Sequence, residues 1–210
     1  MRLALFGGTF DPPHRGHLAI AKAAADAFRL TTVLFAPVGS QPLKEGRTAT
    51  SFADRLAMVR LACEADPRFQ ASTLDAPRSD GAPNYTVDTL ASLRSQMPAA
   101  SLFNLVGADS FLSLHSWREP QRLLALAEWI VVSRPGSPLD DLTRLGLATE
   151  EHKRVHLIET VHEDVSATDL RRRLAAGEDC DDLLPPPVAQ YIQSHGLYRD
   201  SPAASASNSS

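Results

Sequence analysis

The sequence predicts an α/β protein with an open, mainly parallel β-sheet, helices on both faces of the sheet and a C-terminal helical segment. Short apolar runs recur along the chain and alternate with segments in which apolar residues have helical spacing. The runs are nearly continuous in apolar residues, which is typical of strands buried on both faces of a parallel sheet. Strands that alternate with helices in this way favour repeated strand–helix–strand units.

The apolar runs predicted as strands are Arg2–Phe6, Thr32–Ala36, Phe69–Thr73, Leu102–Val106, Trp129–Ser133 and Val155–Glu159. The segments predicted as helices between them are Gly16–Phe28, Phe52–Ala65, Thr86–Met97, Glu119–Ala127 and Leu139–Leu147. Two further helices are expected after the last strand, Ser166–Leu174 and Val188–Ser194.

Several predicted helix ends carry the residues that commonly form caps. Ser51 is followed three residues later by the carboxylate of Asp54, which is the pattern of a capping box. Ser166 begins a segment of the same form, with Asp169 at the equivalent place. Gly177 is expected to end that helix, because glycine readily adopts the left-handed conformation found at helix C-termini.

Length and composition indicate one globular domain at residues 1–199, followed by a disordered Ser/Ala-rich tail at 200–210. The net charge of −4 and the pI near 6.0 argue against a nucleic-acid-binding protein. No apolar run approaches the roughly 20 residues that a membrane span needs. Cys63 and Cys180 lie far apart and are expected to be buried thiols. With no signal peptide evident, we expect a cytoplasmic protein.

The most informative stretch is 7–17, which joins the first predicted strand to the first predicted helix. Gly7 and Gly8 have no Cβ, so their amides can approach a phosphate closely, and Thr9 adds a hydroxyl donor. His14 and His17 are three residues apart and share one helical face. Imidazoles at a helix N-terminus suit a polyphosphate, because the helix dipole is positive there.

Each part of this stretch alone has an ordinary structural explanation. A glycine pair is only a turn signal, and a single histidine is more often a surface or core residue. The spacing of His14 and His17 also occurs in zinc sites, but no cysteine cluster or His-Glu-x-x-His pattern accompanies it. We therefore expect no metal held by protein ligands. The whole combination is far more restrictive than any part.

The run Phe6–Pro12 followed by His-x-Gly-His at His14–His17 resembles the bacterial nicotinate-nucleotide adenylyltransferase family of the nucleotidyltransferase superfamily. The resemblance extends to about Arg199 and implies a Rossmann-like fold. It implies that AMP is transferred from ATP to nicotinate mononucleotide, which yields deamido-NAD and pyrophosphate. It also implies a requirement for Mg²⁺, bound mainly through the ATP phosphates.

The resemblance assigns roles to residues in several parts of the chain. Catalytic roles are implied for His14, His17 and Arg171. ATP binding is implied for Gly7, Gly8, Thr9, Phe10, His17, Asp109, Arg134, Ser166, Thr168 and Arg171. Binding of the acceptor substrate is implied for Lys44, Tyr85, Thr86 and Trp117.

Chemistry and structure offer two explanations for most of these residues. Arg171 has the planar fork that suits phosphate oxygens, and Trp117 could stack on a flat pyridine ring. The structural alternatives are a solvated arginine for Arg171 and a buried core residue for Trp117. Asp109 could hydrogen-bond a ribose hydroxyl or cap a helix that starts at Ser110. Thr86 could bind the pyridine carboxylate or simply begin a helix.

The loop Pro37–Thr50 is long for a strand–helix connection, and it departs from the family pattern. The family usually has Pro-x-His-Lys there, whereas this chain has Leu43 at the position of the histidine and retains Lys44. The loop is either a segment that closes over substrate or a solvated surface loop. Leu43 receives no catalytic role.

Three alternatives to the nicotinate reaction remain at this stage. The acceptor could be nicotinamide mononucleotide or phosphopantetheine, or the protein could be a non-catalytic nucleotide-binding regulator. The sequence leaves the oligomeric state open, a homo-oligomer included.

Overall fold

The structure, a computed structural model, describes residues 1–39, 50–133, 146–159 and 166–199. In these ranges the strands form one sheet in the order β3-β2-β1-β4-β5-β6, with every pair parallel. The strands are β1 (Arg2–Gly8), β2 (Thr32–Pro37), β3 (Phe69–Ala71), β4 (Ser101–Gly107), β5 (Glu128–Ser133) and β6 (Val155–Glu159). This confirms the predicted open parallel sheet, and its strand order is that of Rossmann-like folds.

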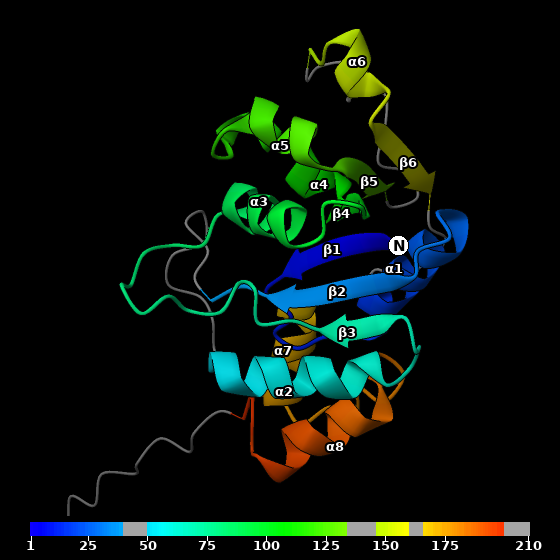
Figure 1. Ribbon diagram of the computed structural model, residues 1–210. Helices are drawn as coiled ribbons and strands as arrows, with labels where there is room; N and C mark the ends of the chain where they lie inside the picture. The colour runs from blue at the N-terminus through cyan, green and yellow to red at the C-terminus, as the bar shows by residue number, and fades with distance from the viewer. Residues whose placement is uncertain (40–49, 134–145, 160–165, 200–210) are drawn as a thin grey trace, which may run out of the picture.

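The helices connect the strands and cover both faces of the sheet (Figure 1). They are α1 (Arg15–Ala27), α2 (Phe52–Cys63), α3 (Thr86–Gln96), α4 (Ala108–Phe111), α5 (Pro120–Leu126), α6 (Thr149–His152), α7 (Ala167–Ala175) and α8 (Pro186–Ser194), with a short 3₁₀ turn η1 (Leu114–Ser116). In Figure 1, α3, α4 and α5 lie on one side of the sheet and α2 lies on the other, with α8 beyond it.

The alternation of side chains along β1 explains why both faces need helices. Leu3 and Leu5 belong to a core cluster that includes residues of α3 and α5. Ala4 and Phe6 belong to a second cluster, with alanines of α1 and Val59 of α2. Successive strand residues point to opposite faces, so a continuous apolar run buries both. A third cluster joins α2 to α7 and α8 and forms the C-terminal helical layer.

The predicted strands are confirmed with small shifts of their ends, and β3 is shorter than expected because residues 72 and 73 leave the sheet. Ser51 accepts a hydrogen bond from the Asp54 amide at 3.1 Å, which confirms the predicted cap of α2. Gly177 has φ of +74° and follows the end of α7, also as expected.

Other expectations at the ends of helices were wrong. Ser166 occupies the N-cap position of α7, but its side chain makes no capping hydrogen bond. The predicted helix Leu139–Leu147 falls mostly outside the described residues, and its last two residues are not helical. Gly146 there has φ of +56°, which is incompatible with a continuing right-handed helix. The short helices α4 and α6 were not predicted, because four residues are too few to show a helical period.

The predicted tail at 200–210 and most of the loop Pro37–Thr50 lie outside the described residues. No helix in the described ranges combines the length and the apolar character that crossing a bilayer requires.

Gly39, after β2, approaches another part of the backbone closely. Its amide donates to the Asp75 carbonyl at 2.7 Å. A Cβ built on Gly39 would lie 2.5 Å from the backbone nitrogen of Pro77, which no side-chain rotation can relieve. Only glycine therefore allows the β2 end to pair with the segment after β3 in this way.

We predict that Gly39→Ala destabilises the protein by about 1–3 kcal/mol, because the backbone must shift to admit the methyl group. Such a loss lowers the melting temperature by roughly 2–4 °C for each kcal/mol in a chain of this size. Thermal unfolding monitored by circular dichroism measures it. Gly107→Ala is the control, since no described atom lies within 4 Å of its Cβ position. Equal melting temperatures for Gly39→Ala and the wild type would contradict the close approach.

Candidate active site

The site predicted from the sequence lies where the order of the strands reverses. β1 pairs with β2 on one side and with β4 on the other, and the chain leaves β1 for α1 at Gly7 and Gly8. In open parallel sheets, ligands bind at this switch point, outside the carboxyl ends of the strands. Gly7 is exposed there, and a Cβ on Gly8 would come within 3.0 Å of the Phe10 ring. A side chain at Gly8 would therefore require the Phe10 ring to shift.

His14 and His17 stack against each other at the N-terminus of α1. His14 is the N-cap residue, and the two ring centroids lie 3.7 Å apart with the planes inclined by 26°. The backbone N–H of His14 donates to Nδ1 of His17 at 3.2 Å. Because Nδ1 accepts this bond, the proton of a neutral His17 ring lies on Nε2, which is then available as a donor.

The surroundings of His17 favour its neutral form. Burial, chiefly, and the nearby charge of His14 hold the pKa of His17 well below its usual value of 6.5. The rings of Phe6 and Phe10 lie edge-on to His17, with centroids 6.1 Å and 4.9 Å away. The pair can thus offer a hydrogen-bond donor to an anion without carrying two positive charges.

Arg55 of α2 ties the turn to the neighbouring loop. Its guanidinium is 1% exposed and donates to the carbonyls of Thr9 and Val38, each at 2.8 Å. Burial lowers the pKa of Arg55, while the charges of Asp11 and Tyr198 oppose that change. An arginine remains charged even so. One buried cation therefore joins the end of β1 to the end of β2.

The predicted second phosphate segment is brought to the first motif. Arg171, in α7, donates through Nη1 to the Asp11 carbonyl at 2.7 Å and through Nη2 to Thr168 Oγ1 at 3.3 Å. Ser166 and Thr168 are exposed at the start of the same helix. Arg171 is therefore not simply a solvated side chain, because one nitrogen docks α7 on the motif.

The predicted acceptor segment lies at the start of α3. Tyr85 is the N-cap residue and Thr86 the first helical residue. The guanidinium of Arg118 lies 4.7 Å from the centre of the Tyr85 ring. Trp117 packs edge-on against Trp129 at 6.0 Å and donates to Ser113, but it is only half-buried. Tyr85 and Trp117 flank the same core cluster, so the structure brings them to one side of the sheet.

A buried carboxylate connects this acceptor segment with the turn after β1. Asp75 is 5% exposed, and its Oδ1 accepts a 2.5 Å hydrogen bond from Thr89 of α3. A Cβ built on Gly7 would lie 3.9 Å from the other oxygen of Asp75, Oδ2. Burial raises the pKa of Asp75, and the hydrogen bond from Thr89 opposes the increase.

The remaining predicted residues have mixed outcomes. Phe10 is buried, with φ of +48°, so its ring supports the turn rather than facing solvent. Asp109 is exposed in the first turn of α4, directly after β4, and the N-cap of that helix is Gly107. The alternative of Asp109 as an N-cap was therefore wrong. Lys44, Leu43 and Arg134 lie outside the described residues.

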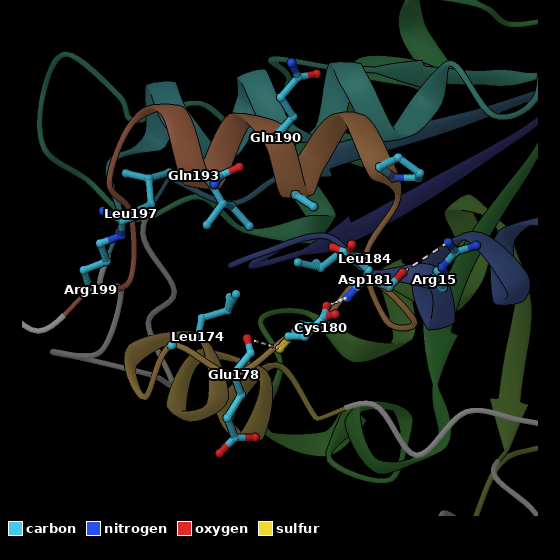
Figure 2. A pocket seen from close by; sticks show the side chains of 15 residues that line it. Arg15, Leu174, Glu178, Cys180, Asp181, Leu184, Gln190, Gln193, Leu197 and Arg199 are labelled. Carbon is cyan, nitrogen blue, oxygen red and sulfur yellow. Dashed lines mark hydrogen bonds between the residues drawn. The ribbon is translucent and has the colours of Figure 1, made fainter.

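A cavity of about 700 Å³ lies between α7, α8 and the segment joining them (Figure 2). Arg15 of the motif lines it, but neither motif histidine does. Its walls mix leucine and isoleucine side chains with Glu178, Asp179 and Asp181. The cavity therefore lies behind the motif and is separate from the switch point.

Comparisons with known proteins agree with this geometry. Residues 5–173 match the cytidylyltransferase-like family. A relative from Roseiflexus sp., named "Probable nicotinate-nucleotide adenylyltransferase", is 43% identical over 197 residues, covering 94% of this chain and 98% of the relative. A relative of the same name from Corynebacterium kroppenstedtii is 40% identical over 207 residues, covering 99% of this chain and 95% of its own. The chain belongs to the nicotinate-nucleotide adenylyltransferase family.

The fold is likewise that of a solved member. The nicotinic acid mononucleotide adenylyltransferase of Plasmodium falciparum complexed with NaAD superimposes with a TM-score of 0.72 at 17% identity. The match covers 94% of this chain and 97% of that one. At this identity the match establishes the shared fold.

Three residues of this family member were not singled out from its sequence: Arg55, Asp75 and Tyr198. Arg55 lies three and four residues before the buried Met58 and Val59, so a charged residue on the apolar stripe of α2 could have drawn attention to it. Asp75 and Tyr198 carry no comparable pattern, because their partners are far away in sequence.

We predict that His17 is neutral near pH 7 and protonated on Nε2. Its depressed pKa means that the unfolded chain binds the proton first, so stability falls as the pH drops below about 6.5. Two-dimensional ¹⁵N NMR of the imidazoles distinguishes the tautomers, with His17→Gln used for assignment. A cationic ring at neutral pH, or a proton on Nδ1, would contradict the geometry.

Proposed function

We propose that this chain transfers the adenylyl group of ATP to nicotinate mononucleotide, forming deamido-NAD and pyrophosphate in NAD biosynthesis. The observation that carries the proposal is the glycine turn with its stacked histidines at the switch point of the sheet. Membership of the nicotinate-nucleotide adenylyltransferase family supports the choice of acceptor.

The reaction is a direct in-line displacement at the α-phosphorus. A phosphate oxygen of nicotinate mononucleotide forms the new P–O bond as the bond to the β-phosphate oxygen breaks, and pyrophosphate leaves with that electron pair. The attacking group is already an anion, so it needs no general base. Catalysis then consists of positioning the two substrates and stabilising the developing charge.

The motif residues suit this task. His17 would donate from Nε2 to a phosphate oxygen, with His14 stacked beside it at the positive end of α1. The exposed backbone at Gly7 leaves room for the nucleotide, with Thr9 and the buried Phe10 completing the turn. Ser166, Thr168 and Arg171 approach from α7, and the same proposal assigns ATP contacts to Asp109 and Arg134.

The acceptor would lie on the α3 side of the switch point. Tyr85 and Thr86 are placed at the start of α3, where a helix N-terminus favours a carboxylate. Trp117 is half-buried near the same cluster, so part of its ring is accessible for stacking. We also propose that Lys44 contributes a positive charge to the acceptor phosphate.

Mg²⁺ is proposed to enter with ATP. The described residues contain no group of three or more histidine, cysteine or acidic side chains that could hold a metal ion. Mg²⁺ usually keeps several water ligands and binds through substrate phosphates. When bound, the ion neutralises charge on the triphosphate.

The proposal places the enzyme in the cytoplasm. Cys63 and Cys180 are buried free thiols, as expected for a reducing compartment. Assembly into a homo-oligomer stays a prediction.

We expect pyrophosphate release when ATP and Mg²⁺ are supplied with nicotinate mononucleotide, and a much lower kcat/KM with nicotinamide mononucleotide or phosphopantetheine. A coupled pyrophosphate assay across these acceptors measures the preference. Faster release with either other acceptor would contradict the substrate assignment, and no release with any acceptor would favour a nucleotide-binding regulator.

We predict that His17→Ala lowers kcat by roughly 10²–10³-fold, the usual effect of losing one donor to transition-state charge. The matched control is His152→Ala, an exposed histidine of α6 that should leave kcat unchanged. Circular dichroism checks that both variants fold. Turnover of folded His17→Ala near the wild-type rate would remove His17 from the mechanism.

A further inference from the structure

The C-terminal segment contacts the histidine motif at several separate points. Besides Arg171, which donates to the Asp11 carbonyl, the carbonyl of Leu183 accepts from the Arg15 amide at 2.9 Å. Arg15 also donates through its side chain to the Asp181 carbonyl at 3.3 Å, as Figure 2 shows. The last contact comes from Tyr198, whose hydroxyl donates to Asp11 Oδ1 at 2.5 Å. The motif is thus held by residues near the other end of the chain.

Tyr198 is unusual because its own backbone has an uncommon conformation. It follows α8 with φ of +63°, a left-handed conformation that a tyrosine adopts only where its surroundings require it. The conformation directs a partly buried hydroxyl onto a carboxylate 187 residues earlier. Burial, chiefly, and the hydrogen bond to Asp11 raise the pKa of Tyr198, while a hydrogen bond with Thr50 opposes the increase, so the hydroxyl keeps its proton and remains a donor.

Asp11 is a sensitive point at which to place that contact. It is 1% exposed and lies between the phosphate turn and the histidines, three residues before His14. Its carboxylate receives the Tyr198 hydroxyl while its carbonyl receives Arg171. Asp11 and Tyr198 also lie close enough to Arg55 to affect that guanidinium electrostatically. A displacement of Asp11 would therefore move both the turn after β1 and the stacked rings of His14 and His17.

We propose that Tyr198 is a positioning residue for adenylyl transfer: its hydroxyl fixes Asp11 and thereby keeps the Gly7–His17 motif in the geometry that the transition state requires. This inference rests on the proposed function. Because the Tyr198 hydroxyl contacts Asp11 and would act through it, its loss should change kcat more than the KM for ATP. An error of about 1 Å in the placement of reacting groups can cost of the order of a hundredfold in rate.

The chain offers a matched control in Tyr191 of α8. Its hydroxyl donates to a different carboxylate, Asp54 Oδ1 in α2, at 3.0 Å. Both tyrosines thus join the C-terminal segment to an earlier acidic residue, but only Tyr198 reaches the motif. Replacing either by phenylalanine removes one oxygen and keeps the ring.

The test measures kcat, the KM for ATP and the melting temperature of Tyr198→Phe and Tyr191→Phe, at a temperature well below both unfolding transitions. We expect Tyr198→Phe to lower kcat by roughly ten- to hundredfold with a KM within about threefold of wild type. Tyr191→Phe should keep kcat within about twofold of the wild-type value. A kcat near the wild-type value in Tyr198→Phe would overturn the proposal. Equal decreases of kcat in the two variants would also overturn it.

A double-mutant cycle with Asp11→Ala gives a readout that a purely structural role would not move. If Tyr198 acts through Asp11, Tyr198→Phe changes kcat little once Asp11 is alanine. Independent, multiplicative effects on kcat would contradict the proposal. The wild-type enzyme separates the two hypotheses: its inactivity with nicotinate mononucleotide refutes the proposed function, whereas an active wild type with an equally active Tyr198→Phe refutes only this inference.

Discussion

The buried guanidinium of Arg55 is the interaction on which the geometry of the site depends. A charge that is 1% exposed is costly unless polar partners surround it, and here two backbone carbonyls from different loops supply them. Arg55 Nε is buried without a hydrogen-bond partner among the described residues. The hydrogen bonds from the two Nη atoms therefore offset the cost of burying the charge. The end of β1 and the end of β2 are consequently tied to one point of α2. The turn after β1 is therefore held where β1, β2 and α2 meet.

The sheet determines where the site lies, and these polar contacts determine the conformation of the turn after β1. Parallel pairing puts the carboxyl ends of β1 and β4 side by side, so a turn after β1 opens onto the switch point. The glycines of that turn carry no side chains, and the rings of Phe6 and Phe10 pack edge-on against His17. The C-terminal layer then covers the back of the motif through Arg171, Leu183 and Tyr198. An adenylyl-transfer site built largely on positioning requires this kind of support.

Features that are encoded within a short stretch of sequence could be predicted, and contacts between distant residues could not. The strands were predictable because their apolar runs bury both faces of the sheet, and the motif was predictable because it combines unusual residues within 7–17. The supporting contacts were not, because Arg55 binds backbone carbonyls and Tyr198 binds a carboxylate 187 residues away. Arg55 is visible only as a charged residue on the apolar stripe of α2, which does not reveal its partners, and Tyr198 leaves no local pattern. Ser166 shows the opposite error: a sequence that fits a capping box does not form the side-chain bond, because helix position alone does not set the rotamer.

We propose that the turn between β1 and α1, and not the cavity between α7 and α8, receives the ATP phosphates. Backbone amide NMR shifts on addition of a non-hydrolysable ATP analogue test it most directly. We expect the largest changes at the amides of Gly7, Gly8 and Arg15–His17, with small changes at Gln190 and Gln193 beside the cavity. Large shifts at the cavity with an unaffected motif would contradict phosphate binding at the turn.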